Sequence, residues 1–226
     1  MKWDLVIFDL DGTLLDTIGD LGAAVDRALQ LRGLPRHSTE EYKTMVGHGV
    51  KNLVKQALPE ERRDEETVMA ALADFRQWYE THIAVKTKPY PGIPELLRDL
   101  AAAGVKLAVA SNKFHEGTVA LIERYFPDIE FVAMLGNKPG LPLKPDAEVV
   151  RSILRASGVA PGRAVLVGDS VSDIRTARSG GVACLAVAWG YRPATALAAA
   201  LAEQPAAPGD SLIVPDVPSL RHLLLD

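Results

Sequence analysis

Acidic side chains in this sequence stand where short apolar runs end, which is where open α/β sheets build their ligand sites. Asp9 and Asp11 come at the end of the first run, Asp169 follows a later one, and Asp173 comes one helical turn after that. Two carboxylates about 4 Å apart repel by about 4 kcal/mol at an effective dielectric of about 20. Such a cluster therefore needs bound protons or a cation. Oxygen ligands favour a hard divalent ion, and Mg²⁺ suits a site that also receives phosphate oxygens.

A hydroxyl, an amide and an ammonium group are predicted at the same edge. Ser111 and Asn112 follow the apolar run Val105–Ala110, and Lys144 stands just before a predicted helix. Any one of the acidic or hydroxyl residues could simply cap a helix, and Lys113 either supports a phosphate or faces solvent. Because these polar residues occur at successive strand ends, a shared ligand site is favoured over such separate roles.

The elements that must position these residues follow from the alternation of apolar runs and amphipathic helices. Helices such as Pro94–Ala103 begin with proline and end at glycine, the expected asymmetry. This alternation predicts an α/β fold, a Rossmann-like parallel sheet with helices on both faces. The predicted strands are Leu5–Leu10, Val105–Ala110, Ala164–Val167, Val182–Val187 and Leu212–Val214.

The interval between the first two strands is too long for a simple crossover. From Asp9 to Val105 there are 96 positions (105 − 9), whereas a βαβ unit needs about 30 residues. The surplus has helical stripes, and Thr17 with Asp20 and Ser38 with Glu41 resemble capping boxes. We therefore expect a helical cap domain at residues 16–88, inserted into a core formed by residues 1–15 and 89–226.

Composition limits the kind of protein. The chain has 226 residues and a net charge of −4, so it lacks the overall basic charge that is typical of nucleic-acid binding. Cys184 is the only cysteine, which excludes an internal disulfide and a multi-cysteine zinc site. The first residues do not resemble a signal peptide, and no apolar run is long enough for a membrane span. We expect a cytoplasmic monomer or homodimer that contacts neither nucleic acid nor membrane.

The motifs also resemble those of a known family. The segment Asp9-Leu10-Asp11-Gly12-Thr13-Leu14-Leu15-Asp16-Thr17 resembles the first motif of the haloacid dehalogenase superfamily. Ser111, Lys144 and Gly168–Asp173 are similar to its second, third and fourth motifs, in the family's order. The inserted helices resemble the cap of the subgroup that includes phosphoglycolate phosphatase. Val46–Val50 and Ala188–Tyr191 carry that closer likeness.

The resemblance implies a phosphatase mechanism. Asp9 would attack phosphorus and form an aspartyl phosphate, and Asp11 would act as general acid and base. Mg²⁺ would be bound by the Asp9 carboxylate, the Asp11 backbone carbonyl and Asp169, with Asp173 as a further ligand or a support for the ligands. The second aspartate of the first motif favours phosphate over halide chemistry, because halide leaves without a proton.

The resemblance also implies the phosphate contacts. Ser111, Asn112 and Lys144 would hold the phosphoryl oxygens, and Gly12 would let the backbone approach the phosphate. In the cap, Gly47, His48 and Gly49 precede a helix, whose first N–H groups form a ready anion site. This segment would suit the carboxylate of 2-phosphoglycolate, or it is a plain turn with His48 in solvent.

We therefore expect a Mg²⁺-dependent phosphomonoester hydrolase that acts on a small phosphorylated metabolite, with 2-phosphoglycolate as the favoured substrate. The alternatives are another small ester such as a sugar phosphate, pyrophosphate, or phosphomutase activity in which a sugar hydroxyl accepts the phosphoryl group. A phosphate-binding module without catalysis is a further alternative, although Asp9, Asp11 and Asp169 are all present.

Overall fold

Six parallel strands form the central sheet in the order β5-β4-β1-β6-β7-β8, which confirms the predicted fold class. The structure is a computed structural model that describes residues 2–203 and 211–226. Residues 1 and 204–210, which fall within the expected core, lie outside the described residues. The strands are β1 (Leu5–Phe8), β4 (Lys106–Phe114), β5 (Ala133–Asn137), β6 (Ala164–Gly168), β7 (Ala183–Val187) and β8 (Leu212–Val214).

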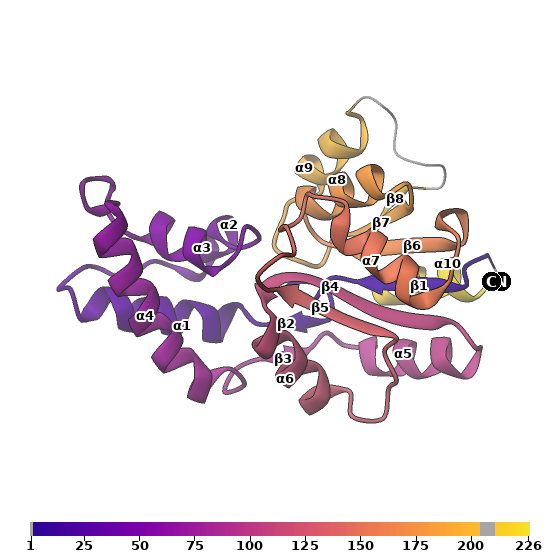
Figure 1. The fold of residues 1–226 in the computed structure, drawn as a ribbon, viewed down its shortest axis with the longest axis horizontal. Coiled ribbons are helices and arrows are strands. Elements are labelled where there is room, and N and C mark those ends of the chain that lie inside the picture. Colours follow the sequence, from indigo (N-terminus) through magenta and orange to yellow (C-terminus); the bar gives the residue numbers. More distant parts are fainter. Residues whose placement is uncertain (1, 204–210) are drawn as a thin grey trace.

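Helices cover both faces of the sheet, and the side chains of β1 alternate between them (Figure 1). Leu5 and Ile7 pack with the cluster of α7, α8 and α9, whereas Val6 and Phe8 pack with that of α5, α6 and α10. Because both faces are buried, β1 is apolar at every position. The helices are α5 (Ile93–Ala102), α6 (His115–Tyr125), α7 (Glu148–Ser157), α8 (Val171–Gly180), α9 (Ala194–Leu201) and α10 (Val217–Leu225).

Four further helices lie to one side of the sheet and form a segment that we call the cap (Figure 1). They have their own apolar cluster, in which Leu21, Leu53 and Phe75 are buried. The apolar stripes seen in the sequence face this cluster, so amphipathic periodicity is what folds the segment. The cap helices are α1 (Ile18–Gln30), α2 (Thr39–Met45), α3 (Val50–Ala57) and α4 (Glu65–His82).

Two linkers join the cap to the sheet and are held together. Short strands β2 (Leu15–Asp16) and β3 (Lys88–Pro89), one on each linker, pair antiparallel. Next to them the buried Asp20 carboxylate accepts hydrogen bonds from the backbone N–H groups of Val85, Lys86 and Thr87 and from the Thr87 hydroxyl, at 2.7–3.0 Å. The first turn of α1 is thereby fixed to the second linker.

The structure corrects one of the two predicted capping boxes. Ser38 and Glu41 form the reciprocal bonds of a capping box at the start of α2, as predicted. Thr17 makes no side-chain cap at α1. Its hydroxyl donates instead to Asp11 Oδ1 at 2.7 Å, and Asp20 bonds the second linker. Tertiary partners thus replace the local pairing that the sequence suggested.

The strand predictions also needed correction. β4 extends to Phe114, beyond the apolar run that ends at Ala110, so Ser111 to Lys113 lie within a strand. β5 was not predicted, although residues 131–135 form an apolar run. Four of its five residues are only partly buried. β5 is an edge strand, paired only with β4 among the described residues.

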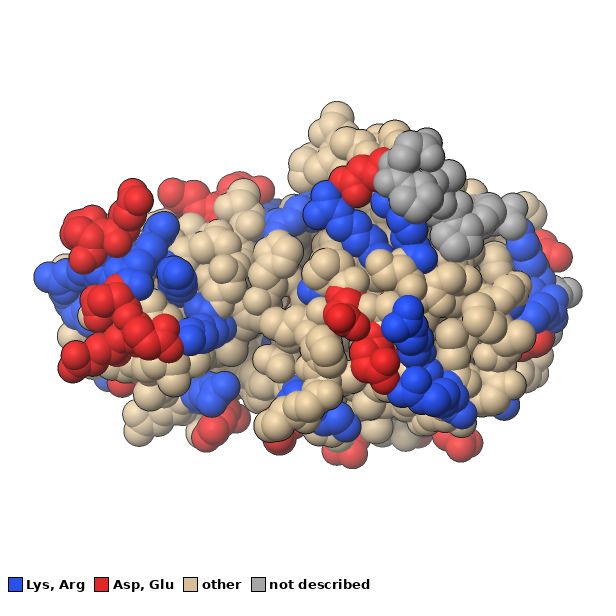
Figure 2. Space-filling model, turned by 45° about the horizontal axis from the view of Figure 1, so that its top comes forward, with Lys and Arg blue, Asp and Glu red and all other residues tan. Residues whose placement is uncertain are grey.

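The face of the molecule drawn in Figure 2 carries charges of both signs. On the side drawn in Figure 2, acidic and basic side chains are interspersed both on the cap and over the sheet domain. In the described part of the chain, every helix is too short or too polar to cross a membrane.

Candidate active site

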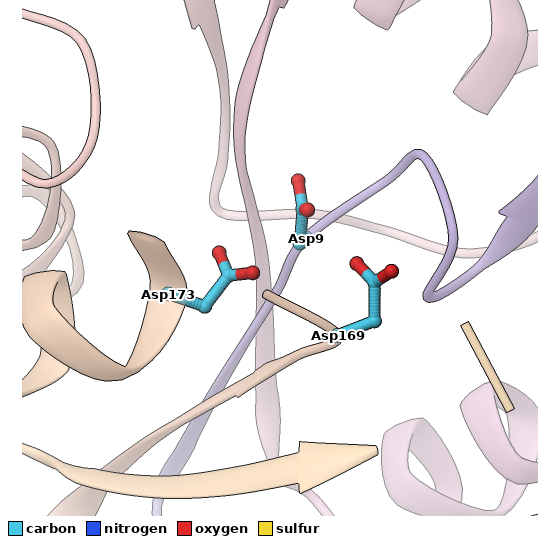
Figure 3. A group of neighbouring side chains, drawn as sticks. All are labelled: Asp9, Asp169 and Asp173. Carbon is cyan, nitrogen blue, oxygen red and sulfur yellow. The ribbon is translucent and has the colours of Figure 1, made fainter. Parts of the chain in front are cut away.

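Three aspartates meet at the carboxyl end of the sheet (Figure 3). Asp9 follows β1, Asp169 follows the neighbouring β6, and Asp173 lies in the first turn of α8. One carboxylate oxygen from each lies within 4.8 Å of the others, and all three residues are buried. The side-by-side pairing of β1 and β6 is what brings residues 9 and 169 together across 160 positions (169 − 9).

Lys144 contacts two of these carboxylates. Its Nζ lies 2.8 Å from Asp9 Oδ1 and 2.6 Å from Asp173 Oδ1, and it donates to the carbonyl oxygen of Ala110 at 2.8 Å. Burial alone would lower the pKa of Lys144, but the carboxylates of Asp173 and Asp9 outweigh it and raise the pKa, so the side chain is charged. The predicted lysine therefore lies in the carboxylate cluster.

The cluster is short of positive charge. Burial raises the pKa of Asp9 well above its usual range, with Asp173 and Asp169 adding to the rise and Lys144 opposing it. Burial, followed by Asp173, raises the pKa of Asp169 to about 7. With all three carboxylates ionised and one contacting ammonium group, the cluster would carry two negative charges, and its donor atoms are all oxygen. This donor set fits a hard divalent cation such as Mg²⁺.

Two glycines make room for Asp169. A Cβ on Gly12 would lie 2.4 Å from Asp169 Oδ2, and a Cβ on Gly190 would lie 2.2 Å from Asp169 Cβ. Gly12 also has a φ of +87°, which other residues rarely adopt. The sequence suggested that Gly12 admits a phosphate, and the structure adds that it admits a carboxylate.

Asp11 lies outside the cluster of three carboxylates. Its Oδ1 accepts hydrogen bonds from Thr17 Oγ1 at 2.7 Å and from Lys113 Nζ at 3.3 Å. Lys113 is buried, and its Nζ also donates to the hydroxyl of Tyr79 on α4 at 2.6 Å. Of the two roles considered for Lys113, exposure to solvent is therefore wrong.

Ser111 and Asn112, two neighbouring residues of β4, differ in their partners. Ser111 lines the cavity above the cluster, and its Oγ accepts from the backbone N–H of Lys113 at 3.2 Å. The side chain of Asn112 is already paired with protein. Its Nδ2 donates to the carbonyls of Gly47 and Lys144, at 2.8 and 3.0 Å, and its Oδ1 accepts from the Lys144 N–H at 2.8 Å.

A small cavity lies between the cap and the sheet edge. Its volume of about 50 Å³ is several times the roughly 10–15 Å³ that a water needs, so it has room for a small ligand. Apolar Leu21, Leu53 and Phe75 line it from the cap, and Asp9 and Lys144 line it from the sheet. The cavity thus has one polar, charged wall and one apolar wall.

The segment that links α2 to α3, with the last turn of α2, is called the cap turn here (residues 43–49). Gly47 and Gly49 line the cavity, as the sequence suggested, and Gly49 precedes α3 directly. His48 is exposed and is not among the residues that line the cavity.

The loop after β7 supplies residues that sequence reasoning assigned no role. The backbone N–H of Tyr191 donates to Asp169 Oδ2 at 2.7 Å, and the Tyr191 hydroxyl accepts from the backbone N–H of Thr17 at 2.9 Å. Arg192 lines the cavity and donates to the carbonyls of Lys43 and Val46 in the cap turn. The likeness noted for residues 188–191 was the only sequence signal for this loop.

Comparisons with known proteins show what this chain is similar to. The sequence profile described as haloacid dehalogenase-like hydrolase matches residues 6–187. Phosphoglycolate phosphatase of Caulobacter vibrioides is 36% identical over 188 residues, which cover 82% of this chain and 79% of that protein. Phosphoglycolate phosphatase 1 of Pseudomonas aeruginosa is 35% identical over 191 residues, 83% of this chain and 70% of that one.

A solved structure is similar over the whole length. The crystal structure of a candidate phosphoglycolate phosphatase from Lactobacillus delbrueckii superposes with a TM-score of 0.90 and is 32% identical. The superposition covers 100% of this chain and 99% of that one, so the likeness includes both the sheet and the cap.

Proposed function

Because the chain belongs to the haloacid dehalogenase-like hydrolases, we propose that this phosphatase uses Mg²⁺ and an aspartyl phosphate to hydrolyse 2-phosphoglycolate. The observation that carries the proposal is the meeting of Asp9, Asp169 and Lys144 at one end of the sheet. A carboxylate nucleophile, further oxygen ligands and a fixed ammonium group are what phosphoryl transfer through a carboxylate needs.

Asp9 is the proposed nucleophile. Its Oδ1 is held by Lys144 Nζ at 2.8 Å and by the backbone N–H of Leu10 at 2.7 Å. These bonds fix the orientation of the carboxylate, so that Oδ2 can be directed at phosphorus. Attack would form an acyl phosphate on Asp9 and release the alcohol, and water would then release phosphate and restore the carboxylate.

Asp9 and Asp169 would hold Mg²⁺ together with the backbone carbonyl of Asp11. Asp173 would support the site through Lys144, because its Oδ1 is paired with the Lys144 ammonium group and its Oδ2 with Ser170. When bound, the metal ion would supply positive charge that balances the cluster and stabilises the phosphoryl oxygens.

Asp11 is the proposed general acid and base. Its carboxyl lies outside the carboxylate cluster and beside the cavity, where it can give a proton to the leaving alkoxide and later take one from water. Thr17 and Lys113 hold its Oδ1. Lys144 and Ser111, which both line the cavity, would bind the phosphoryl oxygens.

The proposed substrate, 2-phosphoglycolate, rests on the relatives' names and on the size of the cavity. The cavity of about 50 Å³ favours a small ester, and its apolar wall would exclude water from the acyl phosphate. We propose that residues 16–88 act as a domain that closes over the substrate and that Gly47 and Gly49 shape the turn above it. The substrate's carboxylate would lie near the start of α3.

Three experiments test the proposal. Asp9→Asn should abolish phosphate release from 2-phosphoglycolate, and chelation of divalent ions should do the same to the unaltered protein until Mg²⁺ is restored. A panel of small phosphate esters should give the highest kcat/KM for 2-phosphoglycolate. Activity in Asp9→Asn would contradict the nucleophile, and a higher kcat/KM for a sugar phosphate would contradict the substrate.

A further inference from the structure

Three hydrogen bonds run from the sheet domain to backbone carbonyls of the cap turn. Arg192 donates to the carbonyls of Lys43 and Val46, and Asn112 Nδ2 donates to the carbonyl of Gly47 at 2.8 Å. The carbonyls belong to the last turn of α2 and the residues just after it. No step of the proposed mechanism uses these bonds, although both donors line the catalytic cavity.

Arg192 suits this position by charge as well as by geometry. The C-terminal end of a helix carries partial negative charge and unpaired carbonyls, and a cation is favourable there. A guanidinium group can reach two carbonyls at once because its donors form a planar fork. Arg192 is also half-buried against the cap turn, so water competes less for these bonds than at an open surface.

Asn112 joins the cap turn to the proposed phosphate site. The same Nδ2 that reaches Gly47 also donates to the carbonyl of Lys144 at 3.0 Å, and Oδ1 accepts from the Lys144 N–H at 2.8 Å. The side chain of Lys144 in turn contacts Asp9 and Asp173. One buried amide therefore fixes the backbone of Lys144 and, with the same nitrogen, the backbone of the cap turn.

We propose that Asn112 and Arg192 form a cap clamp. The clamp positions the cap turn over the cavity and links closure of the cavity by the cap turn to the position of Lys144. Both are positioning residues that act through the cap turn and Lys144. The inference rests on the proposed function. It assigns the Asn112 side chain to this link, because both of its polar atoms are paired with protein.

The clamp predicts a link between phosphate binding and order in the cap turn. Hydrogen exchange of peptides that cover residues 43–50 is measured with Mg²⁺ present, with and without inorganic phosphate. In the unaltered protein phosphate should slow this exchange. In Asn112→Asp, which keeps the acceptor for the Lys144 N–H but loses the donor to the carbonyls of Gly47 and Lys144, phosphate at saturating concentration should still bind yet give no such slowing.

Arg192→Met tests the second half of the clamp. Exchange in the cap turn should rise about tenfold with or without phosphate, which corresponds to the loss of about 1.4 kcal/mol of hydrogen bonding. Arg178→Met is the matched control, because Arg178 also donates to two carbonyls near a helix end, those of Ala200 and Leu201, far from the cavity. This control should leave cap-turn exchange unchanged.

Kinetics provide a separate readout. If the clamp closes a small cavity, Arg192→Met should lower kcat/KM for 2-phosphoglycolate at least tenfold more than for the bulkier p-nitrophenyl phosphate. Arg178→Met should change both values by the same factor. A general loss of folding would lower both activities together and would not change their ratio.

The proposal is overturned if phosphate slows cap-turn exchange in Asn112→Asp as much as in the unaltered protein, or if Arg192→Met exchanges like Arg178→Met. If Asn112→Asp fails to fold, the Arg192→Met comparison still decides. Failure of the proposed function would be seen differently, as a lack of ester hydrolysis by the unaltered protein, whereas the exchange measurements need only inorganic phosphate.

Discussion

At the scale of single residues, the active-site carboxylates work against folding unless a cation balances them. Asp169 is 2% exposed, and a neighbouring carboxylate, Asp173, adds to its burial cost. The raised pKa means that the folded chain holds a proton on Asp169 which the unfolded chain releases above about pH 4. Without metal, stability due to this group is therefore lost as the pH rises from about 4 to about 7.

Asp169→Asn should remove this pH dependence. In metal-free protein the substitution should raise the free energy of unfolding by about 2 kcal/mol at pH 8 and change it little at pH 4. The rise of the Asp169 pKa to about 7 sets an upper limit of about 4 kcal/mol on this gain. Urea unfolding at both pH values measures the difference. With saturating Mg²⁺ at pH 8 the unaltered chain should be more stable than Asp169→Asn, because the ion binds the native carboxylates of the unaltered chain. A gain that is equal at both pH values would contradict the argument.

Lys113 should matter through the carboxyl beside it. Lys113→Met removes a bond to Asp11 Oδ1 and leaves Thr17 as its remaining described donor. A less well oriented acid should slow the departure of an alkoxide more than that of a phenolate. We expect kcat to fall about tenfold more for 2-phosphoglycolate than for p-nitrophenyl phosphate. Lys55→Met, on the exposed face of α3, is the control. Equal losses for both esters would indicate a role in binding alone.

Sequence reasoning identified Asp9 and Asp169, because residues at the ends of parallel strands meet wherever the strands are neighbours. Lys144 was identified from its place before a predicted helix and from the resemblance to the family's third motif. Sequence reasoning could not identify the roles of Asn112 and Arg192. Those roles depend on which backbone carbonyls of the cap turn face the sheet domain. The orientation of a carbonyl in another segment cannot be predicted from residue types or their spacing. The assignment of Asn112 to phosphate followed from its place beside Ser111, and the structure shows the side chain turned to protein partners.

At the scale of elements, the two linkers are joined by one buried carboxylate. Thr17 and Asp20 have the spacing of a capping box, and local rules favoured that pairing. The structure differs because Asp20 reaches N–H groups of residues 85–87, which local spacing cannot reveal. β5 was not predicted although residues 131–135 are apolar. In the structure its partly exposed residues pair with β4 at the edge of the sheet.

Asp20→Asn should loosen the linkers. An amide has one acceptor oxygen in place of two and cannot satisfy the donors of residues 85–87. Because charge-assisted bonds at a buried site are lost, we expect a decrease of about 2–3 kcal/mol in the free energy of unfolding. Cleavage by a protease at residues 84–88 should also become faster. Asp64→Asn, at the exposed start of α4, should cost less than about 1 kcal/mol and leave that cleavage unchanged.

At the scale of the whole molecule, the chain contains separate apolar clusters for the cap and for the two faces of the sheet. The length of the insertion between the first two strands predicted that the cap would exist, but the sequence did not predict how it seats on the sheet. That seating depends on the clamp, the Asp20 linkage and the bond from Lys113 to Tyr79. Because the cap has one apolar cluster, the sheet has two, and only two linkers join cap and sheet, we expect the cap to open at a lower free energy than the sheet.

Native-state hydrogen exchange of two matched variants tests this expectation. Leu97→Ala removes a buried side chain beneath the sheet, and Phe75→Ala removes one from the cap; each should cost about 3 kcal/mol or more. If the cap opens while the sheet stays folded, Leu97→Ala destabilises the closed and the cap-open states equally. It should then accelerate exchange in β1 and β6 and leave the slowest amides of α1 and α4 unchanged, whereas Phe75→Ala should accelerate both sets. Equal acceleration of all four elements by Leu97→Ala would mean that cap and sheet unfold as a single unit.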